Sequence, residues 1–165
     1  MRKLLVITAL ILFAGIAFGQ TSNTATVDIE AEKAALNELM DKYDSAYKTF
    51  DVSTMASYLS EDLLFCGTDP SEFFNKQQIT DLWTQIPDNT VFELKSISDR
   101  KIKVAPDGNS AIVVTQYIAP IISPKMPLRW VYHFVKTNDN WMILFVNVAF
   151  IPKNEDIQKL NEAID

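Results

Sequence analysis

The chain has 165 residues, the length of about one domain, and hydrophobic residues make up 48% of it against 22% charged. Its formal net charge is −6 and its one basic cluster is Arg100–Lys103, so nucleic acids and anionic membranes are poor partners for it. A single cysteine, Cys66, and a single histidine, His133, exclude an intrachain disulfide and metal sites built on several cysteines or histidines. Four glycines form no phosphate-binding loop, so we expect neither a metal nor a cofactor.

Residues 1–19 have the pattern of a secretory signal peptide. A positive start at Arg2-Lys3 precedes an apolar run over 4–18, and Ala17-Phe18-Gly19 places small residues at a cleavage site. An uncleaved anchor is the alternative, but this run is shorter than the roughly 20 residues that cross a bilayer as a helix. We therefore expect an exported protein, periplasmic or secreted, with no membrane attachment after cleavage. In that oxidising setting we expect Cys66 to be a buried thiol, with a disulfide between two chains as the alternative.

The first half of the mature chain predicts three helices and one short strand. Apolar side chains recur at helical spacing over 28–50, and Asp51 has the position of an N-cap that starts a second helix. Apolar residues align at spacings of three and four over 75–86, which predicts a third helix. Between them, 63–66 is expected to be a short buried strand.

The second half predicts strands. Four segments are rich in branched and aromatic residues: 91–105, 111–118, 128–136 and 141–150. The segments that separate the first pair and the last pair have the composition of hairpin loops, so we expect a four-stranded antiparallel meander. Helices followed by strands predict an α+β fold with the helices on one face of a curved sheet. A short amphipathic tail helix is expected within 152–165.

Three stretches resemble the SnoaL-like branch of the nuclear transport factor 2-like superfamily. They are Tyr47-x-x-Phe50-Asp51, the run from Leu63 to Pro70, and Arg129 to Tyr132 together with Asn140 to Ile143. The resemblance covers nearly the whole mature chain and places the domain at 28–151. It implies a cone-shaped roll, in which a curved antiparallel sheet wraps around a long N-terminal helix and leaves a pocket at one end.

The same resemblance leaves the activity open. The superfamily includes ketosteroid isomerases, dehydratases and epoxide hydrolases, and also proteins that only bind or assemble. Many SnoaL-like relatives carry His-x-Ser on the last strand, where this chain has Asn147 and Ala149, and Val131 stands where the family often has threonine. These departures lower the expectation of acid–base catalysis.

Alternation along the strands predicts which side chains line the pocket. Trp130 and Tyr132 share one face of their strand, and a hairpin tip at 138–139 would place Phe145 and Asn147 on the same face. Helical residues and a neighbouring strand complete the expected ligand-binding set: Tyr47, Trp83, Tyr117, Arg129, Trp130, Tyr132, Phe145 and Asn147. The alternative is that these aromatic side chains simply fill the core.

Asp69 and His133 are the candidates for acid–base catalysis. A carboxylate in a loop at the mouth of the cone resembles the general base of isomerases of this superfamily, and histidine titrates near neutral pH. In that case Tyr117 or Tyr132 would polarise a carbonyl group. Each candidate also has a structural interpretation, because aspartate before proline is ordinary turn chemistry and a histidine between aromatic residues is usually structural.

Two further charged groups have open or structural interpretations. Arg129 either reaches an anionic ligand, pairs with a carboxylate such as Asp69, or is a solvated charge. Asp41, Asp44 and Lys48 lie at steps of three and four along the first helix, which predicts a solvated, ion-paired face rather than a site.

The sequence thus predicts an exported α+β cone that binds a small apolar or amphipathic molecule or acts as an assembly module. The alternative is an isomerase, dehydratase or hydrolase that uses Asp69 or His133, and a third possibility is a filled cone that only binds a partner. We expect a homodimer, because relatives pair through the outer sheet face and both faces of these strands carry apolar residues.

Overall fold

The computed structural model describes residues 27–87 and 90–164, so the expected signal peptide lies outside the described residues. The elements in chain order are α1 (Ile29–Thr49), α2 (Val52–Ser57), β1 (Leu59–Cys66), β2 (Phe73–Phe74), α3 (Lys76–Thr84), β3 (Lys95–Ser96), β4 (Lys101–Val104), β5 (Ser110–Ala119), β6 (Ser123–Thr137), β7 (Asn140–Phe150), a 3-10 turn (Asn154–Asp156) and α4 (Ile157–Ala163). Within these residues no helix is both long and apolar enough to span a bilayer.

The long helix α1 lies within the predicted range 28–50 and is capped at both ends. The Asp28 carboxylate accepts a hydrogen bond from the Ala31 N–H, and Phe50 ends the helix with a left-handed φ of 49°. Its buried face consists of Leu36, Met40, Tyr43, Ala46 and Tyr47. The next helix starts as predicted, because the Asp51 carboxylate accepts from the Thr54 N–H.

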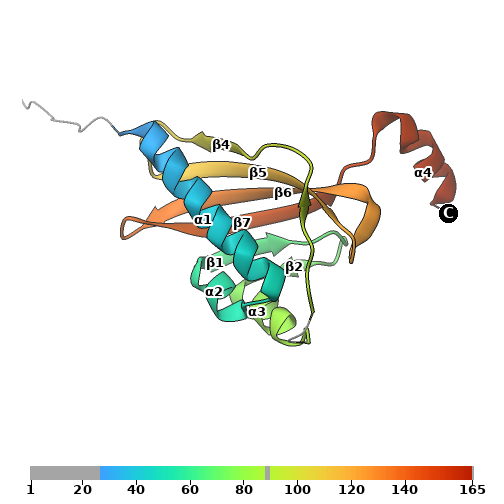
Figure 1. Cartoon of the computed structure of the whole chain (residues 1–165), viewed down its shortest axis with the longest axis horizontal. Helices are drawn as coiled ribbons and strands as arrows, with labels where there is room; N and C mark the ends of the chain where they lie inside the picture. Colours follow the sequence, from blue (N-terminus) through green and yellow to red (C-terminus); the bar gives the residue numbers. More distant parts are fainter. Residues whose placement is uncertain (1–26, 88–89, 165) are drawn as a thin grey trace, which may run out of the picture.

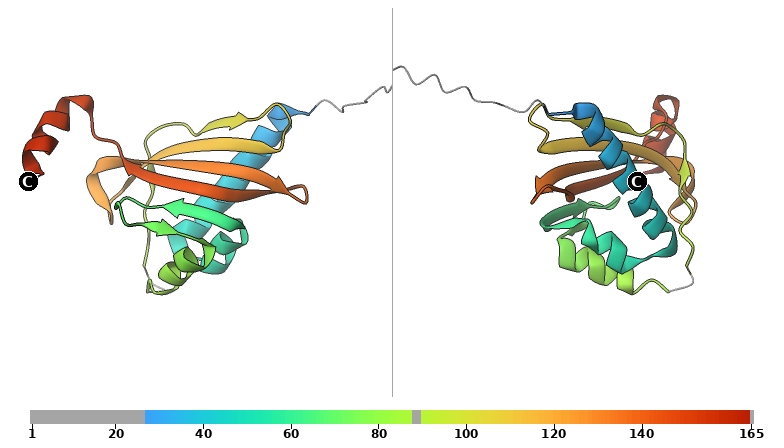
Figure 2. Two further views of the ribbon diagram at one scale, coloured as in Figure 1. Left: turned by 180° about the vertical axis from the view of Figure 1, so that it is seen from behind. Right: turned by 60° about the vertical axis from the view of Figure 1, so that its left-hand side comes forward.

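One curved sheet wraps around α1. Its strand order is β2-β1-β7-β6-β5-β3, with β4 also pairing with β5. Helix α1 crosses one face of this sheet, and α2 and α3 lie together at one end, beside β1 and β2 (Figure 1). Seen from behind, the opposite face of β5, β6 and β7 carries no helix of the described chain (Figure 2). The expected α+β cone is therefore confirmed.

The sheet departs from the expected meander in two places. Strand β1 pairs in parallel with β7, so the sheet is mixed rather than purely antiparallel. The expected strand over 91–105 is broken into β3 and β4, because the chain between them turns Arg100 toward α1. Both features depend on contacts between distant segments, which a local pattern does not contain.

A β-bulge in β7 overturns the expected distribution of side chains over its two faces. Opposite the consecutive residues His133 and Phe134 of β6 lie Phe145 and Ile143, so Leu144 is an extra residue on β7. One extra residue reverses the alternation beyond it. Phe145 and Asn147 therefore lie on the outer face, and the expectation that they share the inner face of Trp130 is wrong.

On β6 the expected alternation holds. Trp130, Tyr132 and Phe134 are almost completely buried beneath α1, whereas Arg129 is exposed and His133 is half-buried on the outer face. Beyond the bulge, Val146 and Val148 take the inner positions on β7. The aromatic interior thus comes from β6, as predicted, and the aliphatic part comes from the shifted register of β7.

Candidate functional site

A cavity of about 330 Å³ lies between the C-terminal end of α1, the helix α3 and the inner face of the sheet. That volume is within the range of small-molecule sites, which are concave and mostly apolar. Seven of its fifteen lining residues are aromatic: Tyr47, Phe50, Phe65, Phe74, Trp83, Phe92 and Trp130. The remaining lining residues are Gly67, Thr68, Glu72, Ile79, Leu82, Ile86, Ile122 and Val148.

Helix α3 supplies one wall because its residues keep a single face toward the cavity. Asn75 and Gln78 form a reciprocal capping box that fixes the start of the helix. From that start, spacings of three and four place Ile79, Leu82 and Trp83 toward the same side. The spacing that predicted the helix therefore also indicates this wall.

Tyr47 is the centre of the aromatic wall. Its ring centroid lies 5.1 Å from that of Trp130, 5.0 Å from Phe92 and 6.0 Å from Trp83, each time edge to face. Edge-to-face pairs of this kind stabilise beyond the area that they bury and hold the rings in fixed orientations. The same rings both belong to the core and line the cavity. The core-filling and the ligand-binding interpretations of these aromatic residues are therefore not exclusive.

The loop between β1 and β2 forms the polar edge of the cavity. The Asp69 N–H donates to the Glu72 carboxylate at 3.0 Å, and the Gly67 N–H donates to the Glu72 carbonyl oxygen. A Cβ atom at Gly67 would collide with the Glu72 side chain, so glycine is required for this close approach. Glu72 is thereby the acidic group at the cavity.

Asp69 itself is a turn residue in the structure. Its carboxylate accepts hydrogen bonds from the N–H and the hydroxyl group of Ser71, at 2.9 and 2.6 Å. These bonds hold the pKa of Asp69 below its ordinary value, and the residue is exposed and does not line the cavity. This geometry matches turn chemistry and gives Asp69 no access to a molecule in the cavity.

His133 and Arg129 lie on the opposite side of the sheet from the cavity. His133 faces Ile112 on β5 and Phe145 on β7, and Arg129 faces Gln116 and is exposed. Arg129 forms no ion pair with Asp69 among the described residues. Neither side chain can act on the contents of the cavity.

Of the eight residues expected to bind a ligand, the structure brings three to the cavity: Tyr47, Trp83 and Trp130. Tyr117 and Tyr132 are buried farther along the interior and do not line it, and Phe145 and Asn147 are on the outer face. The sequence analysis missed the lining residues of β1, β2 and the 91–122 region, among them Phe65, Phe74, Phe92 and Ile122.

A polar cluster occupies the interior next to α1. The carboxylate of Asp44 accepts hydrogen bonds from the Tyr117 hydroxyl at 2.8 Å and from the Arg100 guanidinium at 3.0 Å. The Asp44 side chain is 17% exposed, whereas that of Asp41, which also binds Arg100, is 74% exposed. The expectation that Asp44 belongs to a solvated face is therefore wrong, because Arg100 and Tyr117 enclose it.

Burial governs the protonation of this cluster. Desolvation raises the pKa of Asp44 above its ordinary value, against the lowering effect of the Tyr117 hydrogen bond and the Arg100 charge. Desolvation and the neighbouring Asp44 charge likewise raise the pKa of Tyr117. Five buried polar atoms in or near the cluster have no hydrogen-bond partner within the described chain: Nε of Arg100, the hydroxyls of Tyr43, Thr115 and Tyr132, and Nε1 of Trp130.

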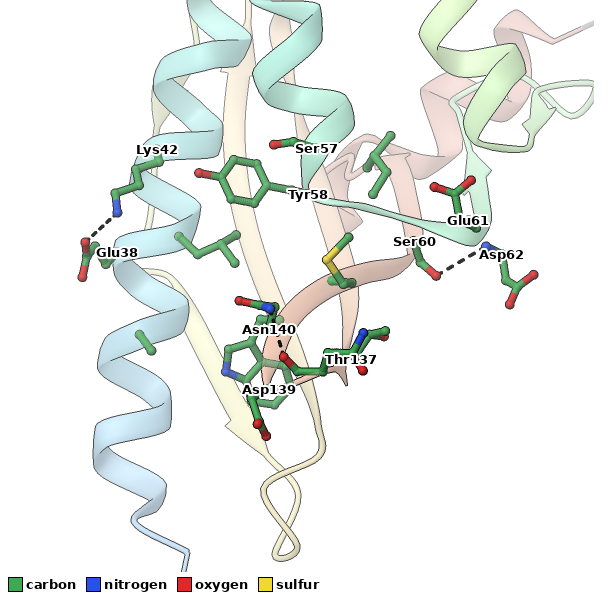
Figure 3. Close-up of a pocket in the computed structure, with 16 residues that line it drawn as sticks. Glu38, Lys42, Ser57, Tyr58, Ser60, Glu61, Asp62, Thr137, Asp139 and Asn140 are labelled. Carbon is green, nitrogen blue, oxygen red and sulfur yellow. Dashed lines mark hydrogen bonds and ion pairs between the residues drawn. The ribbon is translucent and has the colours of Figure 1, made fainter.

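A second hollow, of about 820 Å³, lies between α1, the α2–β1 junction and the tip of the β6–β7 hairpin (Figure 3). Its rim is charged: Lys42 pairs with Glu38 at 2.7 Å, and Glu61, Asp62 and Asp139 also line it. These groups are exposed to solvent. A hydrated, charged groove offers a small molecule far less apolar burial than the aromatic cavity, which is therefore the candidate site.

Solved structures share this fold. A nuclear transport factor 2-like protein of unknown function from Pseudomonas putida has a TM-score of 0.62 at 11% identity, over 76% of this chain and 91% of that one. A nuclear transport factor 2-like protein from Cytophaga hutchinsonii has a TM-score of 0.60 at 15% identity, over 72% and 98% of the two chains. A Xanthomonas campestris protein described as a calcium/calmodulin dependent protein kinase II association domain has a TM-score of 0.56 at 18% identity, over 72% and 87%.

These similarities define the class of the protein: it has the nuclear transport factor 2-like fold, as the sequence resemblance implied. No curated protein matches the chain. The SnoaL-like domain family matches residues 36–149, and the chain belongs to that family. Fold and family together are compatible with a ligand-binding or an enzyme-like domain.

Proposed function

We propose that this protein is an exported binding protein that holds a small, mostly apolar molecule in the cavity between α1 and α3. The observation that carries the proposal is the cavity itself, whose wall consists largely of aromatic rings in fixed edge-to-face contacts. Apolar burial in such a site contributes about 25 cal/mol for each Å² removed from water. A cavity of about 330 Å³ limits the ligand to a compact molecule.

The polar edge of the cavity narrows the chemistry of the ligand. Glu72 is the ionisable lining residue, and no lysine or arginine is among the residues that line the cavity. An anionic ligand would bring two negative charges together without a compensating cation. We therefore infer a neutral or cationic molecule, with any polar group directed toward Glu72 and Thr68.

The test is a thermal-shift screen of neutral, cationic and anionic apolar compounds of matched size, with native mass spectrometry to confirm stoichiometry. A blocking variant, Leu82→Trp, places a bulky ring at the cavity. Leu64→Trp is the matched control, because Leu64 is 45% exposed and Leu82 is 43% exposed, but only Leu82 lines the cavity. We expect Leu82→Trp to weaken ligand binding at least about tenfold and Leu64→Trp to leave it unchanged.

Either of two outcomes would contradict the proposal. The first is that the blocking and the control variant bind the selected compound equally. The second is that anionic compounds bind as tightly as neutral ones of the same size, which would remove the inference drawn from Glu72. Both variants should unfold within about 1 kcal/mol of the wild type, because both positions are partly exposed.

Export and self-association belong to the same proposal. The pattern of residues 1–19 supports export of the chain, to the periplasm or the medium. The outer face of β5–β7 supports a homodimer, because it exposes Ile112 and half-buries Val131, Val135 and Phe145 without a helix above them. The Xanthomonas protein of similar structure is described as an association domain, which agrees with an assembly role.

A second function, acid–base catalysis, is favoured by one observation, the buried carboxylate of Asp44. Asp69 and His133 do not reach the cavity; Asp44 does not line it either, but it lies one helical turn from Tyr47, which does, and burial raises the pKa of Asp44. A buried carboxylic acid beside tyrosine hydroxyls is a suitable proton donor or acceptor. An enzyme of this kind would lose turnover in Asp44→Asn while keeping its affinity for the ligand, whereas a pure binding protein would show no turnover in either form.

A further inference from the structure

The C-terminal segment stands apart from the rest of the fold. After β7 the chain passes through Pro152 and a 3-10 turn into α4, which projects beyond the end of the sheet (Figure 1 and the left view of Figure 2). None of the residues of α4 is buried. A helix of seven residues is not stable alone in water, so α4 needs a surface to pack against.

The segment has apolar side chains suited to such packing. Ile157 and Leu160 are three residues apart and therefore on one side of α4, and Ile164 follows its last turn. Ile157 is 41% exposed and Ile164 is 76% exposed. Around these residues the segment 152–164 carries two basic and three acidic residues. It is an acidic amphipathic segment without a packing partner among the described residues of its own chain.

The outer face of the sheet is complementary to this segment in charge and in apolar surface. The strands β4, β5, β6 and β7 contain no aspartate or glutamate, although the chain has 21 of them. On the outer face, Lys103 lies beside Ile112, which faces His133, and Arg129 lies farther along β6. The face is thus apolar and basic on an otherwise acidic protein, and like charges do not oppose an acidic partner there.

The direction in which the chain leaves the sheet determines whether the segment can pack on its own sheet or only on the sheet of a second copy of the protein. The Ile151 N–H donates to the Pro127 carbonyl oxygen at 2.9 Å, which holds the start of the segment against the end of β6. Pro152 keeps the residue before it extended. These constraints direct α4 away from its own sheet (Figure 2).

We propose that the segment 152–164 of one copy packs on the outer face of β5–β7 of a second copy, and that reciprocal exchange of the two segments forms the dimer. This inference rests on the homodimer of the proposed function and adds the element that forms it. A twofold axis makes the arrangement self-complementary, since each copy contributes one segment and one face. The exchange buries the apolar side of α4 and the exposed Ile112 in the same contact.

The test begins with sedimentation of the full mature chain and two variants of it. Ile157→Asp places a charge in the segment, and Ile112→Asp places one on the face. We expect each to raise the dimer dissociation constant at least about tenfold. The matched controls are Asn161→Asp, on an exposed position of α4, and Val91→Asp, an exposed apolar residue outside β4–β7, and neither should change the constant.

A mixing experiment separates exchange from a dimer held by the sheets alone. A pair of one Ile157→Asp chain and one Ile112→Asp chain retains one intact segment on one intact face. Neither variant paired with itself retains any such contact. After mixing in equal amounts, native mass spectrometry with one copy isotopically labelled should therefore show mixed dimers well above the half of all dimers that random pairing gives.

Three outcomes would overturn the inference. A wild type that stays monomeric at high concentration removes it together with the proposed homodimer. An Ile157→Asp variant that dimerises like the wild type removes the segment and leaves the homodimer. Mixed dimers at the statistical proportion or below exclude exchange. The ligand-binding proposal is read out separately by Leu82→Trp and is unaffected by any of these results.

Discussion

Two neighbouring regions of the interior beneath α1 bury their side chains in opposite ways. One helical turn before Tyr47, Asp44 forms with Arg100 and Tyr117 a closed polar cluster in which the charges neutralise each other. Near the C-terminal end of α1, Tyr47 and Trp83 belong to an aromatic wall that leaves about 330 Å³ of space. Polar groups are therefore enclosed where the interior is full, and apolar groups surround the part that is hollow.

The comparison teaches that the stability and the binding capacity of this fold have separate sources. A substitution in the polar cluster leaves a buried charge or hydroxyl without a partner, which lowers the free energy of unfolding. A substitution in the cavity wall changes a side chain that already faces empty space. It should therefore change the affinity for a ligand more than the free energy of unfolding. The predictions below test this separation, in order of decreasing effect.

Arg100→Met should have the largest effect on stability. Removing the guanidinium leaves the buried Asp44 carboxylate without its cation, so the free energy of unfolding should fall by about 3 kcal/mol near neutral pH. The loss should shrink as the pH falls, because Asp44 can then take up a proton. Urea unfolding at several pH values measures both.

The matched control is Asp41→Asn, which removes the other, exposed partner of Arg100. An exposed ion pair contributes little, so this change should cost less than about 1 kcal/mol. If Arg100→Met and Asp41→Asn lowered the free energy of unfolding equally, the burial of Asp44 would not determine how much the cluster stabilises the fold.

Two tyrosine variants should differ although each loses only a hydroxyl group. Tyr117→Phe removes the hydrogen bond to the Asp44 carboxylate and should lower the free energy of unfolding by about 2 kcal/mol. Tyr132→Phe removes a buried hydroxyl that has no partner in the described chain, so it should be neutral within about 1 kcal/mol or slightly stabilising. Chemical denaturation of the two proteins under one set of conditions decides, and the reverse order would contradict the assignment of the cluster.

Asp44→Asn should change how the free energy of unfolding depends on pH. The pKa of Asp44 in the folded state lies above its ordinary value of 3.8, because burial disfavours the carboxylate. The folded protein therefore binds this proton more tightly than the unfolded chain, and stability falls as the pH rises from about 3.8 through the folded pKa. The difference in unfolding free energy between wild type and Asp44→Asn should follow that course, and a flat difference would mean that the carboxylate is not desolvated.

The sequence predicted those parts of the fold whose causes are local. The spacing of apolar residues places the first and third helices, and the Asp51 cap places the start of the second, because helical hydrogen bonds and caps join near neighbours. Alternation along β6 likewise identifies Trp130 and Tyr132 as inner residues, since polar and apolar positions alternate there. Family resemblance supplied the overall cone.

The features that the sequence did not predict depend on contacts between distant segments or lie in a strand where polar and apolar residues do not alternate. Strand β7 is almost continuously apolar, so no alternation reveals the extra residue Leu144 that moves Phe145 and Asn147 to the outer face. Asp44 has the sequence context of a solvated helix face, and only the approach of Arg100 and Tyr117 from other elements encloses it. The cavity wall combines residues of six helices and strands with the loops between them, so it was only partly predicted for the same reason.

The parallel pairing of β1 with β7 has a consequence for the order of folding. Until Asn140–Phe150 has been synthesised, β1 has only the two-residue strand β2 beside it, so one edge of an apolar strand stays open. Contacts between segments this far apart in the chain slow folding. The sheet can therefore close only after the segment Asn140–Phe150 has left the ribosome, and a chain interrupted before position 140 would expose an unpaired, aggregation-prone edge.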